Sequence, residues 1–150
     1  MTVGDICTRK IVVAPRTEMI VDAAKRMRTS HVGSLVVVEN RNGRHIPIGI
    51  VTDRDIVISV VAGDPDHINH VLVGDVMRDE LVTAREHDSV ESALKMMGEH
   101  GVRRLPIVAA DGALAGILTL DDVLHYLLAQ QGALVALIAR EQSHERQYRV

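Results

Sequence analysis

The stretch Gly49-Ile50-Val51-Thr52-Asp53-Arg54-Asp55 returns later in the chain as Gly116-Ile117-Leu118-Thr119-Leu120-Asp121-Asp122, and this repetition decides the fold. In each copy a short apolar run leads through a threonine into acidic residues. That order predicts a buried strand followed directly by a helix. Two copies of one unit in a chain of 150 residues predict a compact body built from two paired halves.

The repetition extends outward from these stretches. Gly4-Asp5-Ile6-Cys7 returns as Gly74-Asp75-Val76-Met77, and Ile11-Val12-Val13, read as a first strand, returns as Leu81-Val82-Thr83. Apolar residues at helical spacing then predict one helix in each half. We align its stripe as Val21, Ala24, Met27 and His31 against Val90, Ala93, Met96 and His100.

Two strands joined by a tight turn follow each of these helices. The first strands are predicted over 34–38 and 105–108, because both runs are apolar and rich in β-branched residues. Asn42-Gly43 and Asp111-Gly112 follow them, and such dipeptides supply the positive φ angles of a hairpin turn. We therefore predict the order strand, helix, strand, strand, helix in each half.

We expect an α+β fold of two tandem βαββα repeats related by pseudo-two-fold symmetry, with a C-terminal helical extension. The expected boundaries are 1–62 for repeat one, 63–73 for a linker, 74–130 for repeat two, and 131–150 for a C-terminal helix and polar tail. Gly63 to Asn69 are expected to break both helix and strand. The last helix is expected to be amphipathic, to be interrupted near Gly132, and to fray from Glu141 onward.

The composition excludes several classes of function. The chain has 17 Lys and Arg against 20 Asp and Glu, so its formal charge is −3. This charge does not favour binding to the negatively charged backbone of a nucleic acid. Phe and Trp are absent and Tyr occurs twice, which removes the usual platform for stacking single-stranded bases. The single cysteine, Cys7, excludes an intramolecular disulfide, and no charged leader opens the chain, so we expect a cytoplasmic protein. The longest apolar runs, such as 134–139, fall far short of the roughly 20 residues of a membrane span.

Thr52 with Asp55, and Thr119 with Asp122, form the strongest local motif, and it has two interpretations. A threonine followed three residues later by an acid caps a helix, because the hydroxyl accepts from a free backbone N–H and the carboxylate suits the positive helix end. A carboxylate in the first turn also accepts hydrogen bonds from ribose hydroxyls, while nearby N–H groups face phosphate. Both interpretations stay open at this point.

The chain resembles a tandem pair of CBS (cystathionine β-synthase) domains, known as a Bateman module. The resemblance covers Gly4 to about Gln130. It is carried by VGDVM (73–77), EHGVRRLPIV (99–108) with its following Asp-Gly turn, GIVTDRDIV (49–57) and GILTLDDVL (116–124). It implies a disc-like pair of units with two pseudo-equivalent clefts for adenosine derivatives such as AMP, ADP, ATP or S-adenosylmethionine.

The resemblance also assigns residues. It places Thr52 and Asp55 at the ribose of one cleft, Thr119 and Asp122 at the ribose of the other, and a basic group for phosphate at Arg103, with Arg104 beside it. The equivalent positions in repeat one are Gly33 and Ser34, so the Asp122 cleft is expected to lack this cation and phosphorylated ligands to prefer the Asp55 cleft. The full set of expected ligand-binding residues is Thr52, Asp53, Arg54, Asp55, Arg103, Arg104, Thr119, Asp121 and Asp122, with adenine walls from Val12, Val13, Val82, Thr83, Val102, Pro106 and Ile107.

We expect a non-enzymatic regulator that binds an adenine nucleotide and signals its presence to an effector protein or through its own homodimer. One alternative is a ligand-free interaction scaffold, in which the Thr–Asp motifs only cap helices. The other is a small nucleotide hydrolase, which is disfavoured because the sequence shows no evident catalytic nucleophile and no pair of catalytic bases. His67 and His70 lack a third ligand at a familiar spacing, so no metal site is expected. The identity of the nucleotide, the occupancy of each cleft, any accompanying Mg²⁺ and the partner stay open.

Overall fold

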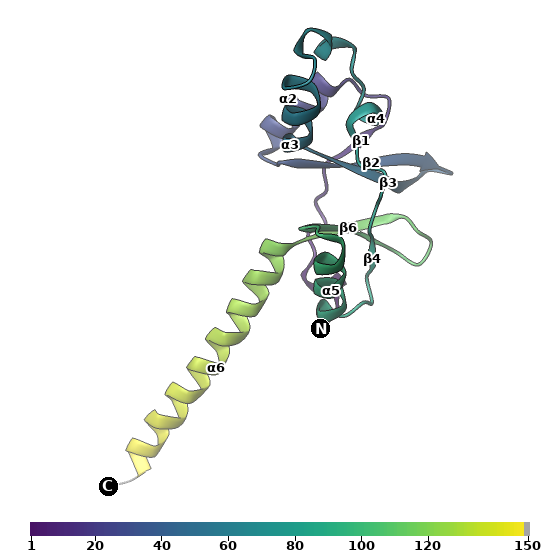
Figure 1. Cartoon of the computed structure of the whole chain (residues 1–150). Coiled ribbons are helices and arrows are strands. Elements are labelled where there is room, and N and C mark those ends of the chain that lie inside the picture. The colour runs from purple at the N-terminus through teal and green to yellow at the C-terminus, as the bar shows by residue number, and fades with distance from the viewer. Residues whose placement is uncertain (149–150) are drawn as a thin grey trace.

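The computed structural model describes residues 1–148, apart from the side chains of Glu145 and Tyr148. Two three-stranded sheets face each other across the middle of the body, with helices on their outer sides (Figure 1). In the first sheet β1 (Val13–Pro15) is parallel to β2 (Ser34–Arg41), which is antiparallel to β3 (Arg44–Thr52). In the second sheet β4 (Ala84–Arg85), β5 (Arg104–Val108) and β6 (Leu114–Thr119) repeat this arrangement. The predicted α+β fold of two βαββα repeats is confirmed.

The helices also occur in matching pairs. The first half contributes α1, α2 and α3, the last continued by a π-helical turn, and a 3₁₀ helix joins it to α4, α5 and α6 of the second half. Their bounds are α1 Val3–Ile6, α2 Ile20–Ser30, α3 Asp53–Ile56, the π-helical turn Val57–Val61, the 3₁₀ helix Pro65–His70, α4 Val73–Val76, α5 Val90–His100 and α6 Leu120–Tyr148.

The predicted pairing of the two helical stripes is wrong by one residue, because Val21 and Ala24 each follow a buried residue of α2 and Met96 precedes the buried Met97 of α5. The buried residues are Ile20, Ala23 and Met27 in α2, and they correspond to Val90, Ala93 and Met97 in α5. The two helix ends explain the error. His31 caps α2 with a left-handed φ of 54°, and its counterpart is Gly101, at φ 62°, rather than His100. Histidine in the left-handed position is uncommon, so no local pattern pairs His31 with a glycine.

The turns agree with the sequence, whereas some boundaries do not. Asn42 and Gly43 have φ angles of 54° and 77° and close the β2–β3 hairpin, as Asn-Gly predicts. The first strands begin two or three residues later than predicted, at Val13 and Ala84. The expected irregular linker contains a 3₁₀ helix, which starts at Pro65 because proline suits the first helical position.

The predicted break near Gly132 is absent, because α6 runs without interruption from Leu120 to Tyr148. An exposed glycine costs a helix about 1 kcal/mol, which is too little to end one of this length. The expected frayed tail is therefore helical as far as Tyr148, and Arg149 and Val150 lie outside the described residues. The segment Leu120–His144 is also long and apolar enough, by length and composition alone, to cross a membrane. The prediction considered only uninterrupted apolar runs and therefore did not include a helix of this length and apolar character.

The two repeats exchange their leading helices. Val3, at the start of α1, is fully buried in the core of the second half, and Val73, at the start of α4, is fully buried in the core of the first half. Backbone hydrogen bonds hold both helices in place. Val3 N–H donates to the Asp88 carbonyl at 2.8 Å, and Val73 N–H donates to the Glu18 carbonyl at 2.8 Å. Neither hydrophobic core is complete without residues from the other half.

We predict that Val3→Ala and Val73→Ala each lower the free energy of unfolding by about 2 kcal/mol, because each removes two buried methyl groups and leaves a cavity. Urea unfolding followed by circular dichroism measures the loss. Val57→Ala is the matched control, because Val57 is exposed and should change stability by less than about 0.5 kcal/mol. Separate unfolding transitions of the two halves in either variant would contradict the exchange.

Candidate functional site

Two cavities lie at the ends of β3 and β6, where each strand meets the next helix. The larger, of about 380 Å³, contains Thr52 and Asp55 and is here called the Asp55 cavity. The smaller, of about 290 Å³, contains Thr119 and Asp122 and is called the Asp122 cavity. Each of the two carboxylates therefore lines a cavity of its own, in keeping with the two clefts that the family resemblance implies. Arg104 is the charged residue that lines both cavities.

The capping interpretation is correct in geometry for both motifs. Asp55 N–H donates to Thr52 Oγ1 at 3.1 Å, and Thr52 N–H donates to Asp55 Oδ2 at 3.0 Å. In the second half Asp122 N–H donates to Thr119 Oγ1 at 3.1 Å, and Thr119 N–H donates to Asp122 Oδ2 at 2.8 Å. Each cap uses Oδ2 of the carboxylate. A second role for either acid therefore rests on the other oxygen, Oδ1.

The Oδ1 atoms of the two acids have different surroundings. Asp55 Oδ1 accepts a hydrogen bond from Arg78 Nε at 3.2 Å, and Asp55 is the one charged residue buried in the described part of the chain. Thr8, the counterpart of Arg78, lines the same cavity as Asp122. Sequence reasoning missed Arg78. Its signal was present, because Arg78 directly follows VGDVM, whereas Thr8 follows the matching residues of the first repeat.

A glycine allows Arg78 to reach this position. The backbone of Arg78 crosses β3 and exchanges two hydrogen bonds with Ile50, of 2.9 and 3.2 Å. A Cβ atom on Gly49 would lie 2.7 Å from the Arg78 carbonyl oxygen, so only glycine permits the crossing. Gly116 serves the first repeat in the same way, because its Cβ would lie 2.6 Å from Cys7 Sγ. Burial raises the pKa of the Cys7 thiol at this contact, which suits a packing role.

The Asp55 cavity is lined by both charged and apolar residues. Four arginines and three acids line it, and the apolar wall comes from Ile50, Leu81, Val82 and Val102. The charged residues are Arg54, Arg78, Arg103 and Arg104, with Asp53, Asp55 and Glu80. Such a cavity places a single buried carboxylate beside several guanidinium groups, which bind phosphate oxygens in pairs.

The Asp122 cavity contains positive charge that comes from positions other than Gly33 and Ser34. Both residues line the cavity and supply no cation, but Lys10 and Arg104 do. Lys10 comes from the segment before β1, and Glu80 stands at the matching place in the other cavity. The two cavities therefore differ in the number and type of their cationic side chains: four arginines line the Asp55 cavity, and one lysine and one arginine line the Asp122 cavity.

The structure brings most of the predicted residues to a cavity, with a few exceptions. The Asp55 cavity is lined by the predicted residues Thr52, Asp53, Arg54, Asp55, Val82, Val102, Arg103 and Arg104. The Asp122 cavity is lined by the predicted residues Val12, Arg104, Thr119 and Asp122. Asp121 lies in a third hollow beside Arg103 and Arg104. Val13, Thr83, Pro106 and Ile107 line none of these, and the last two are buried within the body.

Within the part of the chain that the structure describes, no group of three or more His, Cys, Asp or Glu side chains is placed to hold a metal ion. His67 contacts Asp64 through Nδ1 at 2.6 Å on the exposed 3₁₀ turn.

Comparison with known proteins identifies the class of protein. The CBS domain family model matches residues 3–62 and 73–129, which is most of the chain, so this protein belongs to the CBS domain family as a tandem CBS pair, or Bateman module. An uncharacterized protein of Methanopyrus kandleri is 40% identical over 134 residues, covering 86% of this chain and 65% of the relative. The chain thus spans slightly less than two thirds of that relative. The CBS domain-containing protein YhcV of Bacillus subtilis is 33% identical, covering 91% of this chain and 92% of the relative.

Solved structures show the same architecture. The CBSX2 protein of Arabidopsis thaliana, solved in complex with AMP, is 29% identical with a TM-score of 0.70, covering 87% of this chain and 98% of that one. The CBS pair of protein MJ0100, solved with 5′-methylthioadenosine and S-adenosylmethionine, is 22% identical with a TM-score of 0.74, covering 87% and 98%, and supports the fold alone. The CBS-CP12 protein of bloom-forming cyanobacteria is hexameric, and it is 27% identical with a TM-score of 0.72, covering 83% and 66%.

We predict that Gly49→Ala lowers the free energy of unfolding by about 1–3 kcal/mol, because its methyl group pushes the Arg78 backbone off β3. Gly98→Ala is the control. Gly98 lies in α5 with no neighbour near its Cβ position, so alanine there should raise stability by up to about 1 kcal/mol. Denaturant unfolding of both variants measures the difference, and equal effects would show that the Gly49 contact is unimportant.

Proposed function

We propose that this protein is a non-enzymatic regulatory module that binds an adenosine-type nucleotide, with the Asp55 cavity as the preferred site. The observation that carries the proposal is the buried carboxylate of Asp55 beside four arginines at one cavity. Membership of the CBS domain family and the AMP complex of CBSX2 support the adenosine class. AMP, ADP, ATP and S-adenosylmethionine are the candidate ligands.

The chemistry of the Asp55 cavity matches the parts of a nucleotide. The carboxylate of Asp55 accepts hydrogen bonds from the two vicinal ribose hydroxyls, and charge-assisted bonds of this kind are strong in a shielded site. Arg54 and Arg103 supply the positive charge for phosphate oxygens. Val82 and Val102 offer an aliphatic surface for the flat base, which suits a chain without Phe or Trp.

A ribose at Asp55 competes with Arg78, because Arg78 Nε already donates to Asp55 Oδ1. The side chain of Arg78 is 73% exposed, so it is free to swing toward solvent or toward phosphate. A nucleotide thus exchanges one partner of Asp55 for another and gains a guanidinium near its phosphate. Loss of the Asp55–Arg78 contact on binding is a local change that the rest of the body can transmit.

We predict that Asp55→Asn weakens AMP binding by about 10-fold or more, since hydrogen bonds to a charged acceptor are worth roughly 1.5–3 kcal/mol. Asparagine keeps a side-chain oxygen for the Thr52 cap, so the fold is retained. Isothermal titration calorimetry measures the affinity, with Asp122→Asn as the matched control that should change AMP binding at the Asp55 cavity by less than about two-fold. Equal AMP affinities for wild type and Asp55→Asn would overturn the assignment of Asp55.

A ligand-free interaction scaffold is the second candidate function, and the capping geometry favours it because caps alone account for Oδ2 of both acids. Thermal shift separates the two functions, since a ligand that binds the native state raises its melting temperature with dose. Unchanged melting temperatures across AMP, ADP, ATP and S-adenosylmethionine would establish the scaffold instead.

We predict that Arg78→Gln shifts the preference between the two ligands from AMP toward adenosine. Adenosine should bind more tightly to the variant, because the ribose no longer competes with Arg78 for Asp55. AMP should lose a phosphate partner, so the ratio of the adenosine Kd to the AMP Kd should fall. Calorimetry with both ligands measures this ratio. Arg41→Gln is the control, because Arg41 pairs with Glu39 on the β2–β3 hairpin and lines neither cavity.

The proposed regulatory role requires a receiver for the signal. We propose a cytoplasmic homodimer that reports occupancy to an effector protein, consistent with the oligomer formed by the related CBS-CP12 protein. The CBS family matches identify no catalytic domain in this chain. Incubation with ATP should therefore yield no product, and steady release of ADP or AMP would instead support the hydrolase hypothesis.

A further inference from the structure

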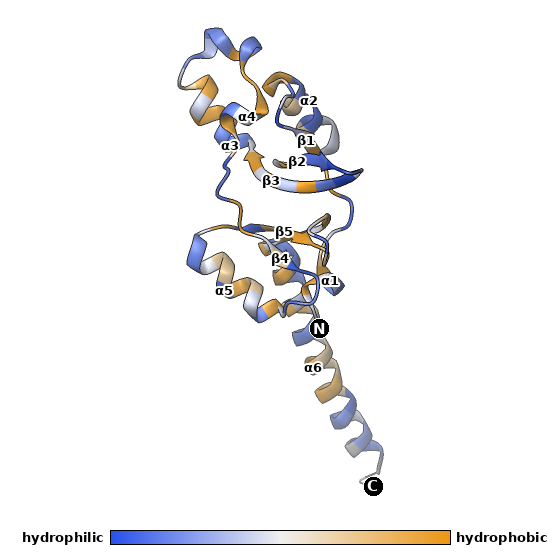
Figure 2. Cartoon of the chain, turned by 90° about the vertical axis from the view of Figure 1, so that its right-hand side faces the viewer, coloured by the Kyte–Doolittle hydropathy of each residue, from blue (hydrophilic) through white to orange (hydrophobic). Residues whose placement is uncertain are grey.

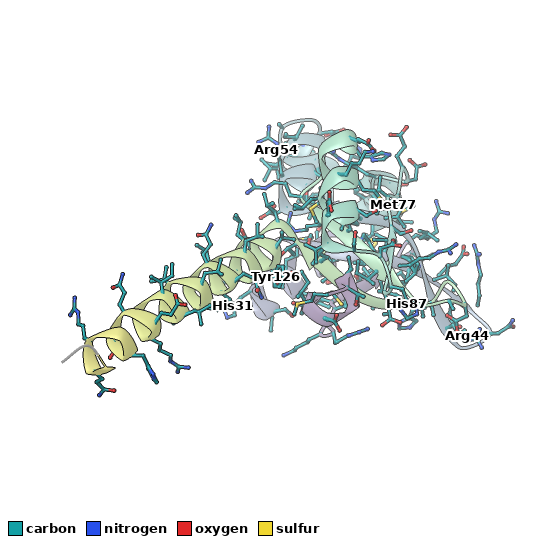
Figure 3. The ribbon with its side chains drawn as sticks, turned by 90° about the horizontal axis from the view of Figure 1, so that it is seen from below. His31, Arg44, Arg54, Met77, His87 and Tyr126 are labelled. Carbon is teal, nitrogen blue, oxygen red and sulfur yellow. The ribbon has the colours of Figure 1, made fainter. Side chains whose placement is uncertain are left out.

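The long helix α6 leaves the body and exposes most of its surface. Figure 1 shows it pointing away from both sheets, Figure 3 labels Tyr126 where it leaves the body, and Figure 2 shows hydrophobic segments along it. Val123 is buried in the second core, whereas the apolar residues beyond it are 43–66% exposed. These exposed residues are Leu124, Leu127, Leu128, Leu134, Val135, Leu137 and Ile138.

The total accessible surface of the chain shows that this exposure is unusual. The chain exposes 10,008 Å², whereas a compact monomer of its mass is expected to expose about 7,500 Å². The excess, about 2,500 Å², is larger than the roughly 800 Å² that each partner buries in a standard protein interface. An apolar face of this kind is a candidate for a covered surface.

Six of these residues form one stripe that is symmetric about Gln131. Leu128 and Leu134 lie three residues before and after Gln131, Leu127 and Val135 lie four, and Leu124 and Ile138 lie seven. At 100° per residue all six fall within about 120° of the helix circumference, with Gln131 near the middle. The stripe therefore reads the same way from both ends.

We propose that α6 pairs with α6 of a second copy of this chain in an antiparallel arrangement, with a two-fold axis at Gln131. Under that symmetry each residue faces the one at equal distance on the other side of Gln131, so every apolar residue of the stripe meets an apolar residue. Gln131 meets its own copy, and two facing amides donate and accept reciprocally. A single polar position in an apolar seam is a known way to set helix register.

The antiparallel direction follows from the position of the body. Val123 and Tyr126 hold the first turns of α6 against the second core, so the bulk of each chain lies at the start of its helix. A parallel pair would bring both bodies to the same end, whereas an antiparallel pair places them at opposite ends. Antiparallel helix dipoles also attract each other.

The apolar length of α6 fits a membrane less well than a second copy. The uncharged run from Val123 to Ala139 contains 17 residues and spans about 26 Å, short of the roughly 30 Å hydrocarbon core. His125, Gln130 and Gln131 lie within it. A second copy of the chain provides hydrogen-bond partners for the Gln131 amide, whereas the hydrocarbon of a membrane provides none.

The decisive experiment uses charge on the full chain. Leu128→Glu and Leu134→Lys should each shift sedimentation equilibrium toward the monomer, raising the dimer dissociation constant at least 10-fold. The double variant Leu128→Glu/Leu134→Lys should recover dimerisation, because the two substitutions face each other only in the antiparallel pair. Ala133→Glu is the control on the opposite side of α6 and should leave the dimer intact.

Cross-linking gives a direct second readout. In a Cys7→Ser background, Gln131→Cys should form a disulfide-linked dimer on mild oxidation, whereas Ala133→Cys should not. A monomeric wild type, a dimer indifferent to Leu134→Lys, or a double variant weaker than both single ones would overturn the proposal. Flotation of a lipid-free monomer with phosphatidylcholine vesicles, abolished by Leu134→Glu, would assign the stripe to the membrane and overturn it as well. None of these results depends on nucleotide binding.

Discussion

The reciprocal burial of Val3 and Val73 is the constraint on which the rest of the structure depends. Each valine completes the hydrophobic core of the opposite half, so neither half of about 60 residues has to bury its core alone. The chain continues from α1 into Cys7–Thr8, which crosses β6, and from α4 into Met77–Arg78, which crosses β3. The exchange that stabilises the fold therefore also carries Arg78 and Thr8 to the two cavities.

Pseudo-symmetry provides two similar cavities, and single substitutions between the repeats make them different. Arg78 donates to Asp55 in one cavity, whereas its counterpart Thr8 lines the Asp122 cavity. Gly33 lines the Asp122 cavity at the position that Arg103 occupies in the Asp55 cavity. The capping bonds are the same in both halves, which shows that the caps belong to the repeat itself. The differences lie at side chains that the fold does not need, and these are the positions through which the two sites can acquire separate preferences.

α6 connects the second cavity with the exposed stripe, because Asp122 caps the first turn of this helix. A change at the Asp122 cavity therefore acts on the root of the same element whose far half we propose as a dimer contact. In the first half, α3 ends after one turn at Ile56, and a short π-helical turn follows. The capacity to reach beyond the body is thus a property of the second repeat.

The sequence by itself determined the repeat, the hairpin turns, the helix caps and the acids at the cavities. These features depend on local chemistry: Asn-Gly supplies positive φ, and Thr with an acid three residues later caps a helix. Only the tertiary structure decided that Arg78 meets Asp55, that Lys10 and Arg104 reach the Asp122 cavity, and that Pro106 and Ile107 are buried. The reason is physical: such contacts join residues distant in the chain, and they arise from the exchange of α1 and α4 and the facing of two sheets, which no local pattern encodes.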